Sequence, residues 1–142
     1  MKNLISILFF FLLFSYTIFP QWYQQNSGTT NTLRDVWFTE LYNGIVVGDF
    51  GTICTTTDGG MTWIFETIGT NYSLSSICFA DANNGWIAGY NIATYSGIIL
   101  KTTNGGTNWT EQSLGTNIDL QAIDFADSVS LNILHPFYAG NL

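Results

Sequence analysis

Short apolar runs alternate with polar turns that contain glycine from residue 22 to residue 127. Trp22, Trp63 and Trp109 each open a stretch in which Gly-Thr follows six residues later and Leu eleven residues later. The copies begin 41 and then 46 residues apart. Short runs rich in β-branched and aromatic residues, bounded by Gly, Asn and Asp, are typical of β-strands. The pattern therefore predicts an all-β chain built from an internal repeat.

Each complete copy of the repeat predicts four short strands. In the first copy they span residues 33–38, 45–47, 52–56 and 62–66. In the second copy they span residues 74–79, 86–88, 98–102 and 108–112. The second copy also carries five extra residues within 90–96, at a turn, which should leave its strands intact.

A four-stranded antiparallel sheet that recurs at intervals of roughly 40 to 50 residues is the signature of a β-propeller blade. We therefore expect a partial β-propeller in residues 21–127. Blade 1 should span about residues 33–66, blade 2 about 74–112, and the start of a third blade about 120–127.

A polar hairpin after the third strand is the most specific motif. It reads Thr-Thr-Asp-Gly-Gly-Met-Thr-Trp from Thr56 and Thr-Thr-Asn-Gly-Gly-Thr-Asn-Trp from Thr102. Asp or Asn can accept hydrogen bonds from turn N–H groups, and paired glycines allow positive φ angles. A catalytic or metal-binding carboxylate would not ordinarily be replaced by an amide in the next copy, so we interpret the motif as structural. Its residues are Thr56, Asp58, Gly60, Thr62, Trp63, Thr102, Asn104, Gly106 and Trp109.

The first hairpin matches the Asp-box, or bacterial neuraminidase repeat, at Thr56, Asp58, Gly60, Thr62 and Trp63. The second hairpin departs from this pattern at Asn104 and Asn108. Residues 22–127 as a whole resemble the family named for the photosystem II stability and assembly factor. The resemblance implies a seven-bladed propeller whose Asp-boxes lie at the blade peripheries, away from a central channel where partners bind. Trp63 and Trp109 could be platforms for stacking sugars, but their position just past the hairpin in each unit favours core wedges under the turn.

The first 20 residues predict a helical signal peptide, because Lys2 precedes the short apolar run of residues 4–14. An uncleaved membrane anchor is the alternative, and cleavage should fall between Ile18 and Trp22. The signal predicts a secreted, periplasmic or cell-surface protein.

Residues 22–25 align with the last strand of a blade although they precede the first three strands. We expect them to form a ring-closing strand in an intact propeller. Residues 128–142 resemble neither earlier copy, since Leu131 and His135 replace the two repeated glycines. They are expected to be the aberrant tail of a truncated chain, and the exposed blade edges should promote self-association.

Composition removes several classes of function. The chain has 3 basic and 10 acidic residues and a net charge of −7, so neither nucleic acid nor an anionic lipid surface is an expected partner. A sialidase needs three arginines to hold its substrate, and Arg34 is the only arginine. The turn at Asp81 lacks the spacing of a calcium loop. His135 has no metal-ligand neighbours in sequence, so we expect no metal and no cofactor.

The two cysteines, Cys54 and Cys78, could pair in an oxidising compartment. Cys54 and Cys78 fall at different positions of the repeat, which favours two separate thiols over a disulfide.

We interpret the whole chain as a non-enzymatic secreted scaffold, a fragment of a larger propeller that binds a protein or a surface polymer. The alternatives are a photosystem II assembly factor-like protein and a fragment of an Asp-box glycoside hydrolase whose catalytic residues are missing.

Overall fold

The structure is a computed structural model of the 142-residue chain, and it describes residues 23–113, 119–125 and 131–134. The expected signal peptide lies outside these residues. The strands are β1 (Leu33–Phe38), β2 (Gly44–Gly48), β3 (Thr52–Thr56), β4 (Ile64–Thr67), β5 (Tyr72–Phe79), β6 (Gly85–Asn91), β7 (Ser96–Thr102), β8 (Thr110–Ser113), β9 (Ala122–Phe125) and β10 (Leu131–Leu134).

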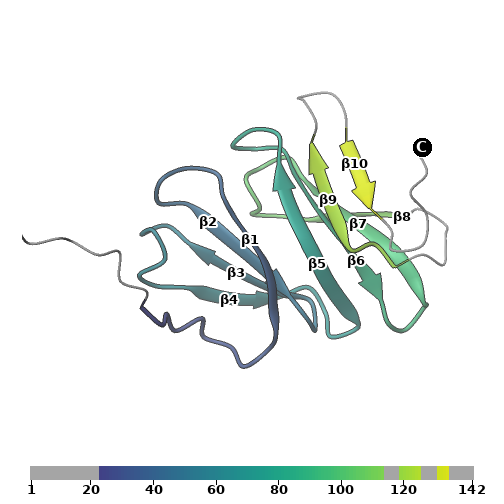
Figure 1. The fold of residues 1–142 in the computed structure, drawn as a ribbon, viewed down its shortest axis with the longest axis horizontal. Coiled ribbons are helices and arrows are strands. Elements are labelled where there is room, and N and C mark those ends of the chain that lie inside the picture. Colours follow the sequence, from purple (N-terminus) through teal and green to yellow (C-terminus); the bar gives the residue numbers. More distant parts are fainter. Residues whose placement is uncertain (1–22, 114–118, 126–130, 135–142) are drawn as a thin grey trace, which may run out of the picture.

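The strands form two four-stranded sheets and one two-stranded sheet. The larger sheets have the orders β1-β2-β3-β4 and β5-β6-β7-β8, with every neighbouring pair antiparallel. The sheets follow one another along the molecule (Figure 1). The first strands contact each other in succession, β1 with β5 and β5 with β9, so they form the inner edge of the array. The predicted all-β partial propeller of two blades and the start of a third is confirmed.

The third unit extends beyond the expected end of the pattern. β9 pairs with β10 in the register Phe125↔Leu131 and Asp124↔Asn132. Blade 1 has the same register at the corresponding positions, Phe38↔Gly44 and Trp37↔Ile45. β9 and β10 therefore pair as the first two strands of a blade do, although the expectation from the sequence placed an aberrant tail from residue 128. Strand pairing uses backbone groups, so it survives the loss of the repeated glycines.

Several strand ends differ from those predicted. β4 begins at Ile64 rather than Thr62, because the Thr62 N–H donates a hydrogen bond to the Asp58 side chain instead of joining the ladder. The five extra residues of blade 2 do not form a simple loop. They lengthen β6 and β7 into a longer hairpin, in which Asn91 pairs with Ser96.

The main core lies between the two large sheets. β2 and β3 contribute Ile45, Val47 and Ile53, and blade 2 covers them with the buried side chains of Leu74, Ile77, Phe79, Ile87, Ile98 and Leu100. A second core on the far side of blade 2 joins Cys78, Ala88 and Ile99 to Leu120 and Ile123 of the third unit. Each sheet thus buries its faces against its neighbours, as expected for repeated blades.

Two of the repeated glycines, Gly48 and Gly89, lie so close to another part of the backbone that a side chain would not fit. A Cβ atom on Gly48 would lie 2.1 Å from the carbonyl oxygen of Thr32, and one on Gly89 would lie 2.4 Å from that of Ser73. In each blade the segment that enters the first strand passes directly over the end of the second strand. The spacing of these glycines is therefore a consequence of how a blade begins.

Asp35 holds the inner edges of the two blades together. Its Oδ2 accepts hydrogen bonds from Ser76 Oγ at 2.8 Å and from the Ile77 N–H at 2.9 Å. The β5 strand has a register shift between Leu74 and Ser76, next to this contact. Asp35 therefore pairs an N–H group at a strand edge that would otherwise need another partner.

Both cysteines are buried free thiols, with Cys54 in blade 1 and Cys78 between blade 2 and the third unit. Burial raises the pKa of the Cys78 thiol to about 12. Burial also raises the pKa of Cys54, whose Sγ lies 3.6 Å from the carbonyl oxygen of Ser27. The two buried thiols thus lie on different sheets, and their raised pKa values disfavour the nucleophilic thiolate form.

The expected ring-closing strand falls partly outside the described residues, at Trp22. Residues 23–25 belong to none of the strands that the structure describes. Ring closure by this segment stays a prediction. In the described part of the chain, the structure has no helix with the length and hydropathy that crossing a membrane requires.

The two blades differ in how much of their apolar surface is covered. Leu33, on the side of blade 1 away from blade 2, is 38% exposed, whereas its repeat equivalent Leu74 is fully buried. We expect Leu74→Ala to lower the free energy of unfolding by about 2 to 5 kcal/mol, and Leu33→Ala by less than about 1.5 kcal/mol. Urea denaturation followed by tryptophan fluorescence measures both. Equal losses for the two variants would contradict the packing described.

Candidate functional site

The first Asp-box hairpin is held by a compact set of hydrogen bonds. Thr56 Oγ1 donates to Asp58 Oδ1 at 2.7 Å and accepts from the Gly60 N–H at 3.0 Å. The two oxygens of Asp58 accept from the N–H and the hydroxyl of Thr62 at 2.9 and 2.6 Å. Gly60 has a φ of 90°, which favours glycine. The bonds from Thr62, with that from Thr56, lower the pKa of Asp58 to about 2.

The second hairpin has the same geometry with an amide in place of the carboxylate. Asn104 Oδ1 accepts from Thr102 Oγ1 at 2.9 Å and from the Asn108 N–H at 3.0 Å. Thr102 Oγ1 in turn accepts from the Gly106 N–H at 3.0 Å. The hairpin therefore needs an oxygen acceptor at this position and does not need a charge.

The tryptophan that ends each hairpin packs under it. The Trp63 ring meets Phe38 edge to face at 6.3 Å between centroids, and the Trp109 ring meets Phe79 in the same way at 6.1 Å. Both tryptophans are half-buried, and Trp109 also packs against the main core. Each ring therefore packs against an aromatic side chain of its own blade, beneath the hairpin that it follows.

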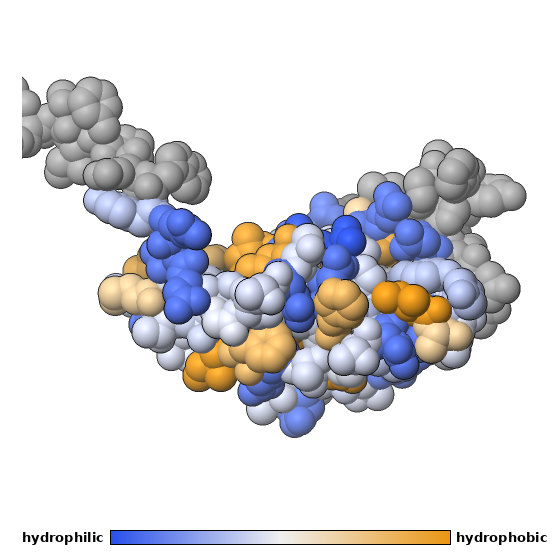
Figure 2. Space-filling view, turned by 90° about the horizontal axis from the view of Figure 1, so that it is seen from below, coloured by the Kyte–Doolittle hydropathy of each residue, from blue (hydrophilic) through white to orange (hydrophobic). Residues whose placement is uncertain are grey.

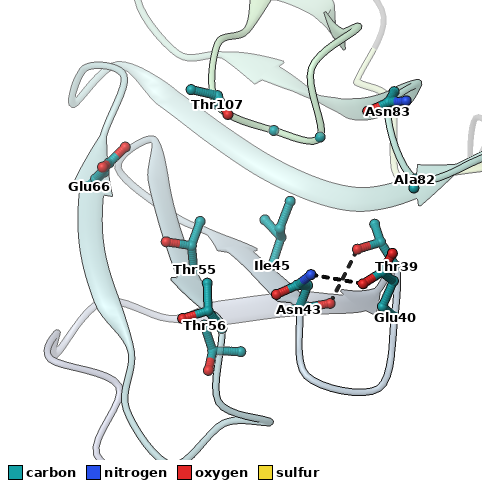
Figure 3. Close-up of a pocket in the computed structure, with 14 residues that line it drawn as sticks. Thr39, Glu40, Asn43, Ile45, Thr55, Thr56, Glu66, Ala82, Asn83 and Thr107 are labelled. Carbon is teal, nitrogen blue, oxygen red and sulfur yellow. Dashed lines mark hydrogen bonds between the residues drawn. The ribbon is translucent and has the colours of Figure 1, made fainter.

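A cleft of about 530 Å³ lies where the second hairpin meets blade 1. Gly106 is pressed against blade 1, because a Cβ atom added there would lie 2.5 Å from Ile45 Cδ1. Figure 3 shows Asn43 and Glu40 on one side of Ile45 and Thr55, Thr56 and Glu66 on the other, with Thr107 and Asn83 facing them from blade 2. We call this the junction cleft.

The residues that line the junction cleft offer hydrogen-bonding groups but no combination of a nucleophile and a base. Asn43 Nδ2 donates to Glu40 Oε2 at 3.1 Å, and Thr39 Oγ1 donates to the Asn43 carbonyl at 3.4 Å. Thr56, one of the hairpin residues, already bonds within the hairpin. The residues that line the cleft include neither histidine nor cysteine, so it has no nucleophile beside a base.

A second cleft, of about 480 Å³, lies at the inner edge of the array, and we call it the inner-edge cleft. It is formed where three successive units converge. Blade 1 supplies Arg34, blade 2 supplies Ser73, Ser75 and Tyr90, and the third unit supplies Asp119 and Gln121. The inner-edge cleft therefore combines an arginine, a carboxylate, hydroxyls and an amide, which can both donate and accept hydrogen bonds.

Asp49 fixes the guanidinium of Arg34 in the inner-edge cleft. Arg34 Nε and Nη2 donate to the two carboxylate oxygens of Asp49 at 2.6 and 3.1 Å. Asp49 Oδ1 also accepts from Ser73 Oγ at 2.7 Å, which links blade 1 to blade 2. The Arg34 bonds lower the pKa of Asp49, and the same pair raises the pKa of Arg34. Arg34 is thus held in one orientation, with donors left for a ligand.

Sequence reasoning considered Arg34 only as the arginine that rules out a sialidase, and it did not identify this cluster. Asp49 lies in the short turn between β2 and β3, and its sequence context is that of an ordinary turn residue. The sequence did carry one signal for the cluster. Blade 1 has a basic residue, Arg34, in its first strand and an acidic residue, Asp49, in the turn between β2 and β3. Blade 2 has Ser75 and Tyr90 at the corresponding positions.

The remaining sequence candidates are turn or packing residues. Asp81 accepts from the N–H groups of Asn83 and Asn84, with which it caps a turn. Bonds from Asn84 lower its pKa. Tyr90, which also lines the inner-edge cleft, packs edge to face against Tyr95, with 6.5 Å between the ring centroids. His135 lies outside the described residues. In those the structure does describe, no three His, Cys, Asp or Glu side chains gather as a metal site would require.

The sheets and their hairpins define a class of protein, the β-propellers whose blades carry Asp-boxes. Residues 15–125 match the family described as "Photosynthesis system II assembly factor YCF48". This match covers most of the chain, so the chain belongs to that family.

Two solved structures are similar to the chain. One, described as "YCF48 bound to D1 peptide", is 28% identical with a TM-score of 0.70, over 83% of this chain and 38% of its own. The other, YCF48 from Cyanidioschyzon merolae, is 23% identical with a TM-score of 0.67, over 80% of this chain and 37% of its own. No curated protein matches significantly. The chain thus spans little more than a third of the length of these relatives.

The charge on Asp58 gives the first hairpin a testable pH dependence. Its pKa in the folded chain, about 2, is below its ordinary value of 3.8, so its contribution to stability is complete above about pH 4 and is lost as the pH falls towards 2. Asp58→Asn should therefore lower the melting temperature at pH 7 and have a smaller effect at pH 2. Circular dichroism melts across this range measure the difference.

Asn104→Asp is the reciprocal variant, since it places a carboxylate where Asn108 N–H and Thr102 Oγ1 already donate. It should raise the melting temperature at pH 7. A difference between Asp58→Asn and the unmodified chain that stays constant from pH 7 to pH 2 would contradict this account.

Proposed function

We propose that the chain is a non-catalytic binding module that holds a segment of another protein against the inner edge of its blades. The observation that carries this proposal is the inner-edge cleft, where three successive units place Arg34 beside hydroxyl, amide and carboxylate groups. An extended peptide exposes N–H and C=O groups in alternation, and such a mixed set of donors and acceptors can pair with both.

Membership of the assembly-factor family supports a protein ligand. The relative that is 28% identical was solved with a D1 peptide. A role in assembling a larger complex, by holding one of its polypeptides, is therefore better supported than a general surface scaffold. Binding to a surface polymer stays a prediction.

Two further parts of the proposal come from the sequence. The apolar run after Lys2 supports export by residues 1–20, which would place the module outside the cytoplasm. The share of the relatives' length that the chain spans supports a larger propeller, of which these blades form a part.

The proposal is tested with a fluorescently labelled D1 peptide, the ligand of the relative, in an anisotropy titration. Arg34→Gln removes a charged donor from the inner-edge cleft, and we expect the dissociation constant to rise roughly tenfold or more. The ion pair between Arg34 and Asp49 is exposed, so its loss should cost at most about 1 kcal/mol of stability.

Lys101→Gln is the matched control. Lys101 is also a cation, but it lies 5.1 Å from the centre of the Trp86 ring, away from the inner-edge cleft. Its replacement should leave peptide affinity unchanged. No binding by the unmodified chain, or equal losses in the two variants, would overturn the proposal.

A further inference from the structure

The inner-edge cleft is lined by residues from three successive units of this chain. Its lining includes Arg34 at the start of β1 and Asp119, which precedes β9. Figure 2 looks onto the end of the molecule at which β1 and β5 begin, and hydrophilic residues form much of the surface there, between scattered hydrophobic ones. Charged groups of the cleft can therefore act directly on a ligand at this surface.

Arg34 is not a free cation, because Asp49 occupies one edge of its guanidinium group. Arg34 Nε and Nη2 donate to the two carboxylate oxygens of Asp49 at 2.6 and 3.1 Å. This bidentate geometry is the one in which arginine binds a carboxylate most strongly. The donors that remain, on Nη1 and Nη2, belong to a guanidinium whose charge is already balanced. They suit a neutral acceptor, such as a peptide carbonyl oxygen.

Asp49 is a fixed part of the cleft rather than a group that a ligand could displace. Ser73 Oγ donates to Asp49 Oδ1 at 2.7 Å, so blade 2 also holds the carboxylate in place. The hydrogen bonds from Arg34 lower the pKa of Asp49, which therefore stays ionised at neutral pH. A carboxylate brought by a ligand would have to compete with an ion pair that the fold has already formed.

Asp119 brings a second carboxylate to the cleft from the third unit. The hydrogen bond to Asp49 raises the pKa of Arg34, and the negative charge of Asp119 adds to this effect. The Asp119 carboxylate takes part in none of the hydrogen bonds that join Arg34, Asp49 and Ser73. Its oxygens can therefore accept hydrogen bonds from a ligand.

The cleft as a whole has a negative charge, since one guanidinium lies near two carboxylates. Lys101, the other cation among the described residues, lies over the Trp86 ring and is not among the residues that line the cleft. Asp119 would repel a carboxylate of a ligand, and Asp49 has already neutralised the cation that could attract one. An ammonium or guanidinium group would instead be attracted to Asp119.

On the basis of the proposed function, we further propose that the inner-edge cleft selects an internal peptide segment with a basic side chain, and that it disfavours a C-terminal carboxylate or an acidic segment. Arg34 donates to a carbonyl oxygen of the peptide backbone, while Asp119 accepts from a lysine or arginine side chain of the same peptide. The hydroxyl of Ser75 and the amide of Gln121 are available for further backbone groups.

The test is a charge scan of the D1 peptide, labelled at its N-terminus with a neutral fluorophore and amidated at its C-terminus. Each neutral position of this end-blocked peptide is replaced in turn by lysine and by glutamate, and fluorescence anisotropy gives each dissociation constant. At positions beside Asp119, the lysine peptide should bind roughly three- to tenfold more tightly than the glutamate peptide. Asp119→Asn should bring this ratio roughly threefold closer to one.

Glu40→Gln is the matched control. It removes the same charge from the junction cleft and keeps an oxygen to which Asn43 Nδ2 can donate. It should leave the ratio of lysine to glutamate affinity unchanged at those positions. Equal effects of Asp119→Asn and Glu40→Gln would indicate a general attraction of an acidic chain for cations, and would overturn the inference. Circular dichroism checks that both variants keep the fold.

The peptide with a free C-terminal carboxylate separates failure of this inference from failure of the proposed function. If neither the free-acid nor the end-blocked peptide binds the unmodified chain, the proposed function itself is wrong. If the free-acid peptide binds and the end-blocked peptide does not, the chain binds a peptide but anchors it by its carboxylate, which overturns the charge selection alone. A scan in which no position favours lysine over glutamate would overturn it as well.

Discussion

Gly106, at the tip of the second Asp-box, rests against Ile45 in the sheet of the preceding blade. This contact joins the two features on which the structure depends, a tight hairpin and a sheet that must be covered. A single four-stranded sheet of this kind leaves apolar side chains on both faces, so its stability depends on its neighbours. Ile45, Val47 and Ile53 are buried only because blade 2 packs over them. The junction cleft is the polar rim of the same contact.

The sequence was sufficient to predict the blades because blade packing imposes a repeated spacing. The glycines at 48 and 89, for instance, recur because the chain must pass over them at each blade entrance. The sequence could not place β10, since Leu131 and its neighbours lack those glycines while their backbone still pairs with β9. It also missed the inner-edge cleft. Arg34 and Asp49 meet through the pairing of β1 with β2, and Ser73 reaches Asp49 from another blade. Such contacts between units have no signature within one repeat.

The Asp-box hairpins and the inner-edge cleft are formed by different sets of residues. The hairpins bond almost entirely within themselves, and Asn104 replaces Asp58 with the same acceptor geometry. They therefore set the shape of each blade and leave the inner edge free to differ between blades. Arg34, Ser75 and Gln121 come from successive units and are chemically different. In this chain the inner edge thus differs from blade to blade, while the hairpins of both blades keep the same geometry.

The contact between Gly106 and Ile45 tests the central claim most directly, because it exists only if the two blades pack as described. In a nuclear Overhauser experiment on the isotopically labelled chain, the Ile45 δ1 methyl group should show strong cross-peaks to the Hα protons of Gly106. It should also show cross-peaks within blade 1, to the side chain of Trp37, its partner in the ladder. Cross-peaks from Ile45 to Trp37 without any to Gly106 would show that blade 1 forms but that the blades do not pack in this way, and would contradict the account.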